Sequence, residues 1–251
     1  MDRIKNTVLI VFFMSLTVGS FAQFGVPNLL KYDKERWHFG ILIGYNLFDY
    51  AISTKPDLSE YDSLFEVNTR AISGYSLGIV TNLRLGKYFD LRFIFPTFSF
   101  GSPMIFYGVR STTTGEIYWY PPAQPEDNPL FDVPKNLDAV WLSFPVLLKY
   151  KSSRIFNNIR AFVVAGGQVG YDLISNSKKR QSGAGVILKL QPWDVQAQVG
   201  AGFDFYCTYF KFTTEFKMSF GLLNTLKSEK DFGGSINSLK AKNIQISFIF
   251  E

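Results

Sequence analysis

The sequence predicts an all-β protein, an eight-stranded antiparallel transmembrane up-and-down β-barrel with both termini in the periplasm. Three observations favour this fold. Apolar and polar residues alternate along eight segments, which is the period of a β-strand. The connections between these segments are alternately short and long, as in barrels whose short periplasmic turns face long extracellular loops. The last segment, residues 243–250, is too apolar to remain an unpaired sheet edge, and closing a barrel removes that edge.

The N-terminus has the pattern of a secretory signal peptide. Arg3 and Lys5 precede an apolar core at residues 7–19, and a small-residue cleavage site ends at Ala22. The apolar core is shorter than the roughly 20 residues that a membrane helix needs. The expected segments are a cleaved signal peptide (1–22), a periplasmic N-terminal lead (23–36) and an outer-membrane barrel (37–251).

The composition suits a membrane barrel and argues against several other classes of protein. Aromatic residues make up 17% of the chain, with 26 Phe and 13 Tyr, as the aromatic girdles of such a barrel require. Signal-peptide cleavage removes one acidic and two basic residues, which lowers the net charge from +5 to +4, too little to indicate a nucleic-acid partner. Cys207 is the only cysteine, so we expect neither an intramolecular disulfide nor a lipid anchor on the mature N-terminus.

Each predicted strand places apolar side chains on one face and small or polar side chains on the other. The strands are expected at residues 37–50, 72–86, 89–98, 139–151, 158–172, 193–206, 209–222 and 243–250. Short links fall at residues 87–88, 152–157 and 207–208, and long ones at 51–71, 99–138, 173–192 and 223–242. The alternation is imperfect in the fifth strand, where Phe162 and Val164 fall on the polar face.

The alternation fits two kinds of barrel, which differ in the face that meets the solvent. A soluble lipocalin-like barrel would have its apolar face inside and a charge-rich face in water. Here the polar face is dominated by Gly, Ser, Gln and Asn, which suit the crowded interior of an eight-stranded barrel. The apolar face ends in two aromatic belts, at Phe39, Phe89, Tyr150, Phe205, Phe210 and Phe250 and at Tyr45, Tyr75, Phe95 and Tyr171. Such belts indicate a surface in outer-membrane lipid.

Charged side chains on the polar face are expected to form an ion-pair network inside the barrel, because an unpaired buried charge is costly. They are Arg84, Asp90, Arg92, Lys149, Arg160, Asp172, Asp194, Asp204, Lys211, Glu215 and Lys217. The network either lines a selective pore or plugs the lumen. Eight strands leave little open lumen, which favours the plug.

We expect no catalytic activity, cofactor or metal site. His38 is the only histidine and begins the first strand, at the opposite end from the outer rim where a histidine base of a barrel hydrolase would act. With one His and one Cys, a metal site would need carboxylates at ligand spacing. The loop carboxylates show no such spacing and are expected to be solvated: Asp57, Glu60, Asp62, Glu126 and Asp127.

Two loop segments have alternative interpretations. The aromatic and proline-rich residues 118–122 and 125–129 either bind a partner or fold back over the barrel mouth. The basic residues 178–180 either contact lipid phosphates or form a solvated turn.

Several segments resemble the PorT family of small outer-membrane barrels from Bacteroidetes. Residues 27–46 carry the specific part of this resemblance, with Tyr32-Asp33 ahead of a first strand that contains His38-Phe39-Gly40 and Gly44-Tyr45-Asn46. Residues 142–150, 166–172 and 200–204 are also similar to that family. The resemblance implies an accessory role in type IX secretion, which exports proteins, including gliding-motility components, across the outer membrane.

The expected role is that of a scaffold or assembly factor that engages other secretion components, since eight strands are too few to pass a folded protein. The expected contact residues in and beside the lead are Lys31, Tyr32, Asp33, Lys34, Glu35, Arg36 and Trp37. The alternatives are a surface barrel of binding or adhesion type acting through its extracellular loops, a narrow pore and, last, an enzyme.

Overall fold

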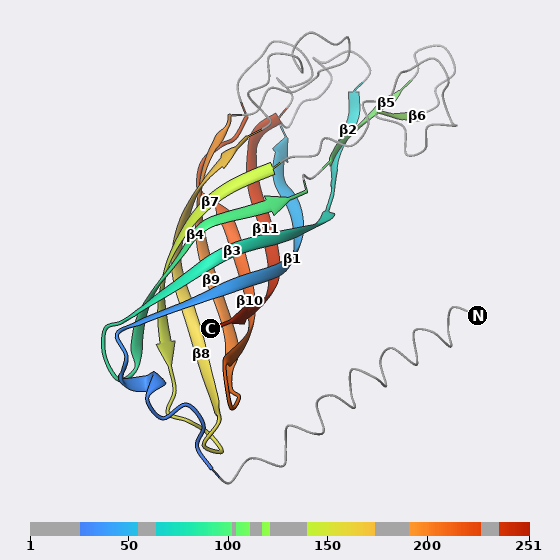
Figure 1. The fold of residues 1–251 in the computed structure, drawn as a ribbon. Helices are drawn as coiled ribbons and strands as arrows, with labels where there is room; N and C mark the ends of the chain where they lie inside the picture. The colour runs from blue at the N-terminus through green and yellow to red at the C-terminus, as the bar shows by residue number, and fades with distance from the viewer. Residues whose placement is uncertain are drawn as a thin grey trace, which may run out of the picture.

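The computed structural model describes residues 26–54, 64–101, 104–110, 117–120, 140–173, 191–226 and 236–251. Within these ranges, eight strands close an antiparallel barrel in the order β1-β11-β10-β9-β8-β7-β4-β3 (Figure 1). They are β1 (Trp37–Thr54), β3 (Ile72–Arg84), β4 (Phe89–Phe100), β7 (Val140–Lys151), β8 (Ile159–Asp172), β9 (Trp193–Tyr206), β10 (Lys211–Gly221) and β11 (Ile236–Phe250). The predicted fold and strand number are confirmed. None of the described residues belongs to a helix long and apolar enough to cross a membrane.

The first and last strands close the barrel. β1 pairs with β11 from Ile41 opposite Phe250 to Ser53 opposite Ser238, and on its other side with β3. The three short links lie at one end of the barrel, here called the turn end, and the other end is called the loop end (Figure 1). Every barrel strand therefore has two hydrogen-bonded neighbours, as a backbone in lipid requires.

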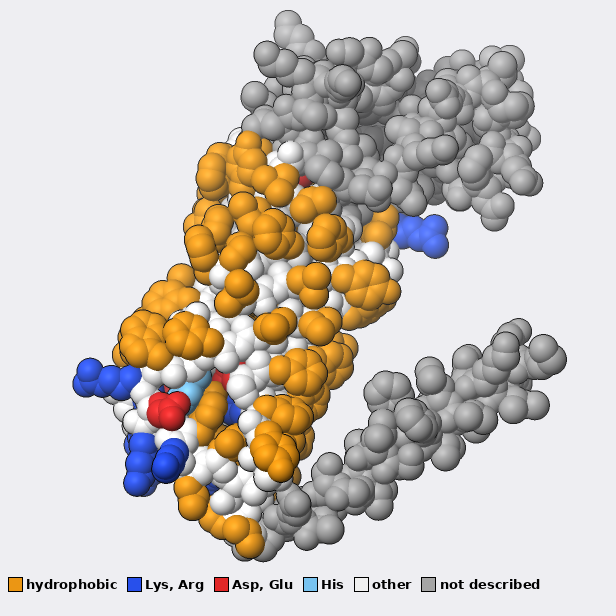
Figure 2. Space-filling view, viewed as in Figure 1, with side chains coloured by type: hydrophobic (Ala, Val, Ile, Leu, Met, Phe, Trp, Pro, Cys, Tyr) orange, Lys and Arg blue, Asp and Glu red, His pale blue; other side chains and the backbone are white. Residues whose placement is uncertain are grey.

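The alternating faces lie as predicted, with apolar side chains outward and small or polar ones inward. On β3, Ile79 is 53% exposed while Ser76 is fully buried. Figure 2 shows the outward apolar side chains covering the visible barrel wall. At the turn end, aromatic side chains pair across strands, with Phe89 5.1 Å from Tyr150 and Phe210 6.2 Å from Phe250 between ring centroids. An inside-out barrel of this kind is built for a lipid surround.

Strand ends differ from the prediction mainly at the loop end. β11 begins at Ile236 instead of residue 243, and β1 continues to Thr54 instead of residue 50. These extensions pair with each other, for example Ile52 opposite Leu239. The polar composition of residues 236–242 hid this pairing, because strand segments beyond the membrane have no need of an apolar outer face.

The predicted long loops at 51–71 and 99–138 contain a second small sheet. β2 (Leu64–Arg70), β5 (Met104–Arg110) and β6 (Ile117–Tyr120) form a three-stranded sheet in the order β2-β5-β6. Residues 118–120 of the aromatic and proline-rich segment lie in β6, while residues 121–122 and 125–129 lie outside the described residues. The loop carboxylates Asp57, Glu60, Asp62, Glu126 and Asp127, the basic residues 178–180 and the signal peptide also lie outside them.

An apolar layer crosses the barrel interior. It consists of Leu42, Val80, Ile94, Leu147, Phe162, Val164 and Ile249, each at most 4% exposed. On β7, Leu147 lies between Lys149 towards the turn end and Pro145 towards the loop end, so the layer divides the interior. Gly202 makes room for Phe162, since a Cβ at this glycine would lie 2.7 Å from the Phe162 ring. The break in alternation at Phe162 and Val164 is thus part of the interior packing.

Candidate functional site: the docked lead and the interior charges

The lead, residues 26–36, lies across the turn end of the barrel and contains the short 3-10 helix η2 (Tyr32–Lys34) (Figure 1). Its first part is held by side chains of the 152–158 turn and by backbone of β9. The Asn28 amide N–H donates to Asn158 Oδ1 at 2.8 Å, and Asn28 Nδ2 donates to the Tyr206 carbonyl at 3.0 Å. Arg154 Nη1 donates to the Asn28 carbonyl at 2.6 Å. The lead is therefore fixed to the barrel by contacts far apart in sequence.

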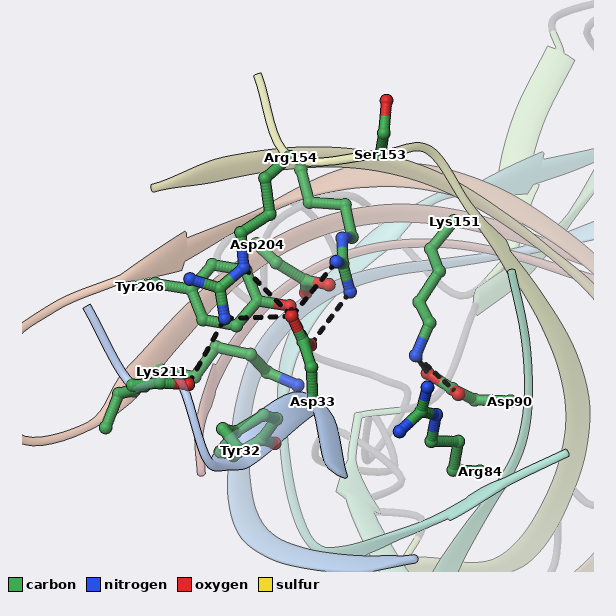
Figure 3. Close-up of polar contacts among 12 residues, drawn as sticks. Tyr32, Asp33, Arg84, Asp90, Lys151, Ser153, Arg154, Asp204, Tyr206 and Lys211 are labelled. Atoms are coloured by element: carbon green, nitrogen blue, oxygen red, sulfur yellow. Dashed lines mark hydrogen bonds and ion pairs between the residues drawn. The ribbon is translucent and has the colours of Figure 1, made fainter. Parts of the chain in front are cut away.

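Asp33 is the central anchor of the lead (Figure 3). Its carboxylate pairs with Arg154 at 2.9 Å and with Arg160 at 3.1 Å, and Tyr206 donates its hydroxyl to the same group at 3.4 Å. Burial alone would raise the pKa of Asp33, but the guanidinium groups of Arg160 and Arg154 outweigh it and hold the pKa below its usual value. The ionised form of Asp33 therefore stabilises the docked lead.

Tyr32 lies next to Asp33 at the turn end of the barrel (Figure 3). Its ring stacks on His38 with centroids 3.8 Å apart, and its hydroxyl donates to Glu251 Oε2 at 2.5 Å. Glu251 also pairs with Lys211 and accepts a hydrogen bond from Asn82 Nδ2. Burial raises the pKa of Tyr32, with Glu251 adding to the effect, so the phenol remains neutral and donating. His38 thus has a packing role at the turn end, where the sequence placed it.

The structure divides the seven predicted contact residues into three groups. Tyr32 and Asp33 face the barrel and are engaged there. Lys31, Lys34, Glu35 and Arg36 are exposed. Trp37 is the first residue of β1 and is 49% exposed on the outward face, two positions before Phe39, so it belongs to the lipid-facing aromatic belt. The accessible surface of the lead is therefore a mixed-charge one.

The innermost predicted charges form two buried clusters. Arg92 pairs with Glu215, and Lys217 Nζ lies 3.8 Å from the other oxygen of Glu215. Lys149 Nζ contacts both oxygens of Asp204 at 2.8 and 2.7 Å. All five side chains are at most 2% exposed. Pairing of this quality is what keeps buried charges tolerable in a narrow barrel.

The remaining predicted interior charges lie nearer the two ends. Asp90 pairs with Lys151 at 2.6 Å and is buried, whereas Arg84 is half-buried and donates from Nε to the Gly86 carbonyl at 3.1 Å. At the loop end, Asp172 and Asp194 are buried, and Gln196 Nε2 donates to Asp194 Oδ2 at 2.6 Å. With Arg160 and Lys211 bound to Asp33 and Glu251, the charges form several local groups along the lumen.

Three charged residues of this site were missed in the sequence: Lys151, Glu251 and Arg154. Strand parity could have found the first two, since Lys151 follows Lys149 and Glu251 follows Ile249 on the inward faces of β7 and β11. Arg154 lies in a turn, where no alternation applies, so the sequence carried no signal for it. Among the described residues, no three His, Cys, Asp or Glu side chains group as metal ligands would.

The chain belongs to the family described as "Outer membrane protein beta-barrel domain", whose model matches residues 21–227. Comparison with curated proteins gives no match. Three solved structures resemble the chain at low identity. Neisserial surface protein A is 10% identical, with a TM-score of 0.43, covering 86% of this chain and 98% of its own. OprG from Pseudomonas aeruginosa is 13% identical, with a TM-score of 0.34, covering 84% of this chain and 93% of its own. Ail of Yersinia pestis is 12% identical, with a TM-score of 0.35, covering 86% of this chain and 98% of its own.

The protein is therefore an outer-membrane β-barrel whose apolar wall lies in lipid. In this class the short turns face the periplasm and the long loops face outward. The lead, the Asp33 anchor and the exposed charges of residues 31–36 accordingly lie at the periplasmic face.

Proposed function

We propose that this barrel is an accessory component of type IX secretion in the PorT family, acting as a scaffold or assembly factor. The resemblance of residues 27–46 to that family supports the proposal from the sequence. The docking of the lead at the turn end supports it from the structure, because two arginines hold Asp33 there. A segment held rigidly at the periplasmic face presents a fixed surface at low ordering cost to a partner.

The partner surface consists of the exposed lead residues Lys31, Lys34, Glu35 and Arg36. Tyr32 and Asp33 act indirectly, by holding this surface in place. Trp37 contributes to the lipid belt instead. The signal peptide at residues 1–22 would deliver the chain to the envelope, and its removal would free the lead at residue 23.

The secreted proteome of a clean deletion strain, compared with a complemented strain, tests the role. We expect proteins bearing type IX signals to accumulate in the periplasm while other outer-membrane proteins stay at normal levels. Intact secretion of these proteins would show that the barrel serves another process.

A second experiment tests the surface. We expect a variant with Lys31, Lys34 and Arg36 changed to Gln to assemble normally but to recover less of its partners on co-purification. The matched control changes Lys240 and Lys242 to Gln, because these exposed lysines lie on β11 towards the loop end. Equal partner recovery from both variants would rule out the lead as the contact surface.

The alternative is a binding or adhesion role at the extracellular face. The observation that favours it is the β2-β5-β6 sheet formed by the two long connections. Replacing the part of the 99–138 loop that follows β4, residues 102–138, with a short linker would abolish such a role and leave a periplasmic scaffold active. A narrow pore has less support, because ion pairs and the apolar layer fill the described lumen.

A further inference from the structure

The loop-end half of the barrel interior contains a small polar cavity. Its volume is about 30 Å³, enough for about two water-sized particles. Its lining includes the polar side chains Thr97, Gln168, Gln196, Asn243 and Gln245 and three charged ones, Asp49, Lys217 and Lys242. The apolar layer bounds it towards the turn end, where Leu42 and Ile94 form part of its wall. The cavity is thus separate from the docked lead.

Lys217 is the buried charge of this cavity, whereas Asp49 and Lys242 of its lining carry opposite charges and are less buried. Its side chain is 2% exposed, and its one ion pair among the described residues is the 3.8 Å contact with Glu215. Glu215 is already engaged by Arg92, so these three charges carry a net charge of +1. The neighbouring Lys149 and Asp204 neutralise each other and leave no spare negative charge. A buried ammonium that shares its only carboxylate requires a further counter-charge.

The polar atoms around the cavity are incompletely paired in the described part of the chain. Thr97 Oγ1 and Asn243 Oδ1 are buried without a hydrogen-bond partner, and both residues line the cavity. The hydroxyl of Thr97 and the three N–H groups of Lys217 are donors, which suit an anion. The Asn243 oxygen is an acceptor and suits a water beside that anion. A cavity with room for about two water molecules suits a small inorganic anion.

We propose that the cavity beside Lys217 binds a small monovalent inorganic anion of the halide class, together with water. The Lys217 ammonium supplies the charge and Thr97 supplies a hydroxyl donor. The anion completes the ion-pair network of the barrel by balancing the Arg92–Glu215–Lys217 group. This site is independent of the secretion role proposed above.

Bromide is the probe for this site, because its anomalous scattering distinguishes it from water. The full mature barrel is refolded in detergent with sodium bromide as the only added salt, then crystallised. We expect an anomalous peak within about 3.5 Å of Lys217 Nζ. A cavity that holds only water under these conditions overturns the proposal.

Two variants make the result specific. Lys217→Met should abolish the bromide peak, whereas Lys242→Met should retain it, because Lys242 also lines the cavity but is exposed. If Lys217→Met does not fold, the wild type and Lys242→Met are compared by urea unfolding in bromide and in gluconate, which is too large for the cavity. Both proteins should unfold at higher urea in bromide. Equal midpoints in the two salts would contradict anion binding.

Discussion

The substitution Asp33→Asn should release the lead from the barrel while leaving the barrel folded. The asparagine side chain is nearly the same size as the aspartate that it replaces but lacks the charge that pairs with Arg154 and Arg160. Both arginines then remain at the periplasmic mouth without a carboxylate partner. The expected effect is therefore local, an increase in the fraction of molecules whose lead is undocked.

The size of the effect follows from the geometry of the two ion pairs. Hydrogen bonds to a charged group contribute about 1.5–3 kcal/mol each. The Asp33 side chain is 30% exposed, so solvent screens both pairs, and the new amide retains part of the hydrogen bonding. We expect a loss of about 2 kcal/mol, which is roughly a 30-fold increase in the undocked fraction.

Hydrogen exchange measured by mass spectrometry in detergent micelles tests this value. The reporters are lead amides held in the docked state, such as Asn28 N–H bonded to Asn158 and Lys34 N–H bonded to the Lys31 carbonyl. Their exchange should speed up about 30-fold in Asp33→Asn. The control is Glu35→Gln, an exposed lead residue, which should exchange as the wild type does. Rates for Asp33→Asn within about threefold of the wild type would refute the role of Asp33 as anchor.

Four further outcomes are expected. The pKa of Asp33 is lowered on folding, so ionised Asp33 stabilises the docked lead fully above the ordinary pKa of 3.8, and this stabilisation is lost as the pH falls through the lower folded value. Pepsin should therefore cleave the lead more readily as the pH falls below 3.8, and a pH-independent cleavage rate would count against this. Lys149→Met should cost about 3–5 kcal/mol in urea unfolding because it leaves the buried Asp204 without its ion-pair partner, and adding Asp204→Leu should recover most of this loss. A single-variant loss under about 1 kcal/mol would contradict the pairing. Gly202→Ala should prevent folding, seen as loss of the heat-modifiable gel band, because a Cβ at this position would clash with a backbone oxygen of the neighbouring strand. The control Gly86→Ala, whose Cβ would have nothing within 4 Å, should fold normally, and equal folding of the two variants would refute the packing argument. The barrel should give no steady single-channel steps in planar bilayers, and stable conductance would contradict a plugged lumen.

Much of the barrel could be predicted from the sequence because lipid imposes a strict rule on every strand. Each outward position must be apolar, and each backbone group must pair within the sheet. The rule made the faces of β3 and β9 readable from alternation alone. It ceases to apply beyond the membrane, which is why the extension of β11 back to Ile236 and the β2-β5-β6 sheet were not predicted.

The docked lead was beyond the reach of the sequence for a different reason. Its anchors are Arg154 in a turn and Arg160 on β8, more than a hundred residues from Asp33 along the chain. No periodicity relates a turn residue to a distant segment. Their meeting depends on barrel closure, which places the 152–158 turn across the barrel mouth from the start of β1, within reach of the lead. The charges were predicted as a group, but their partners required the three-dimensional arrangement.

The side chains that fill the lumen leave no open path for a solute through the described part of the barrel. A solute crossing from the loop end would meet the Lys217 cavity, then the apolar layer, then the Lys149–Asp204 pair, and finally Tyr32 and Asp33 of the lead. Opening that path would break several buried ion pairs at once, each costing about 3–5 kcal/mol. The buried ion pairs and the apolar layer thus make the interior of this barrel rigid. For the scaffold role proposed above, the contact surface is therefore expected at an end of the barrel, and among the described residues the turn end carries an anchored, charged and exposed segment.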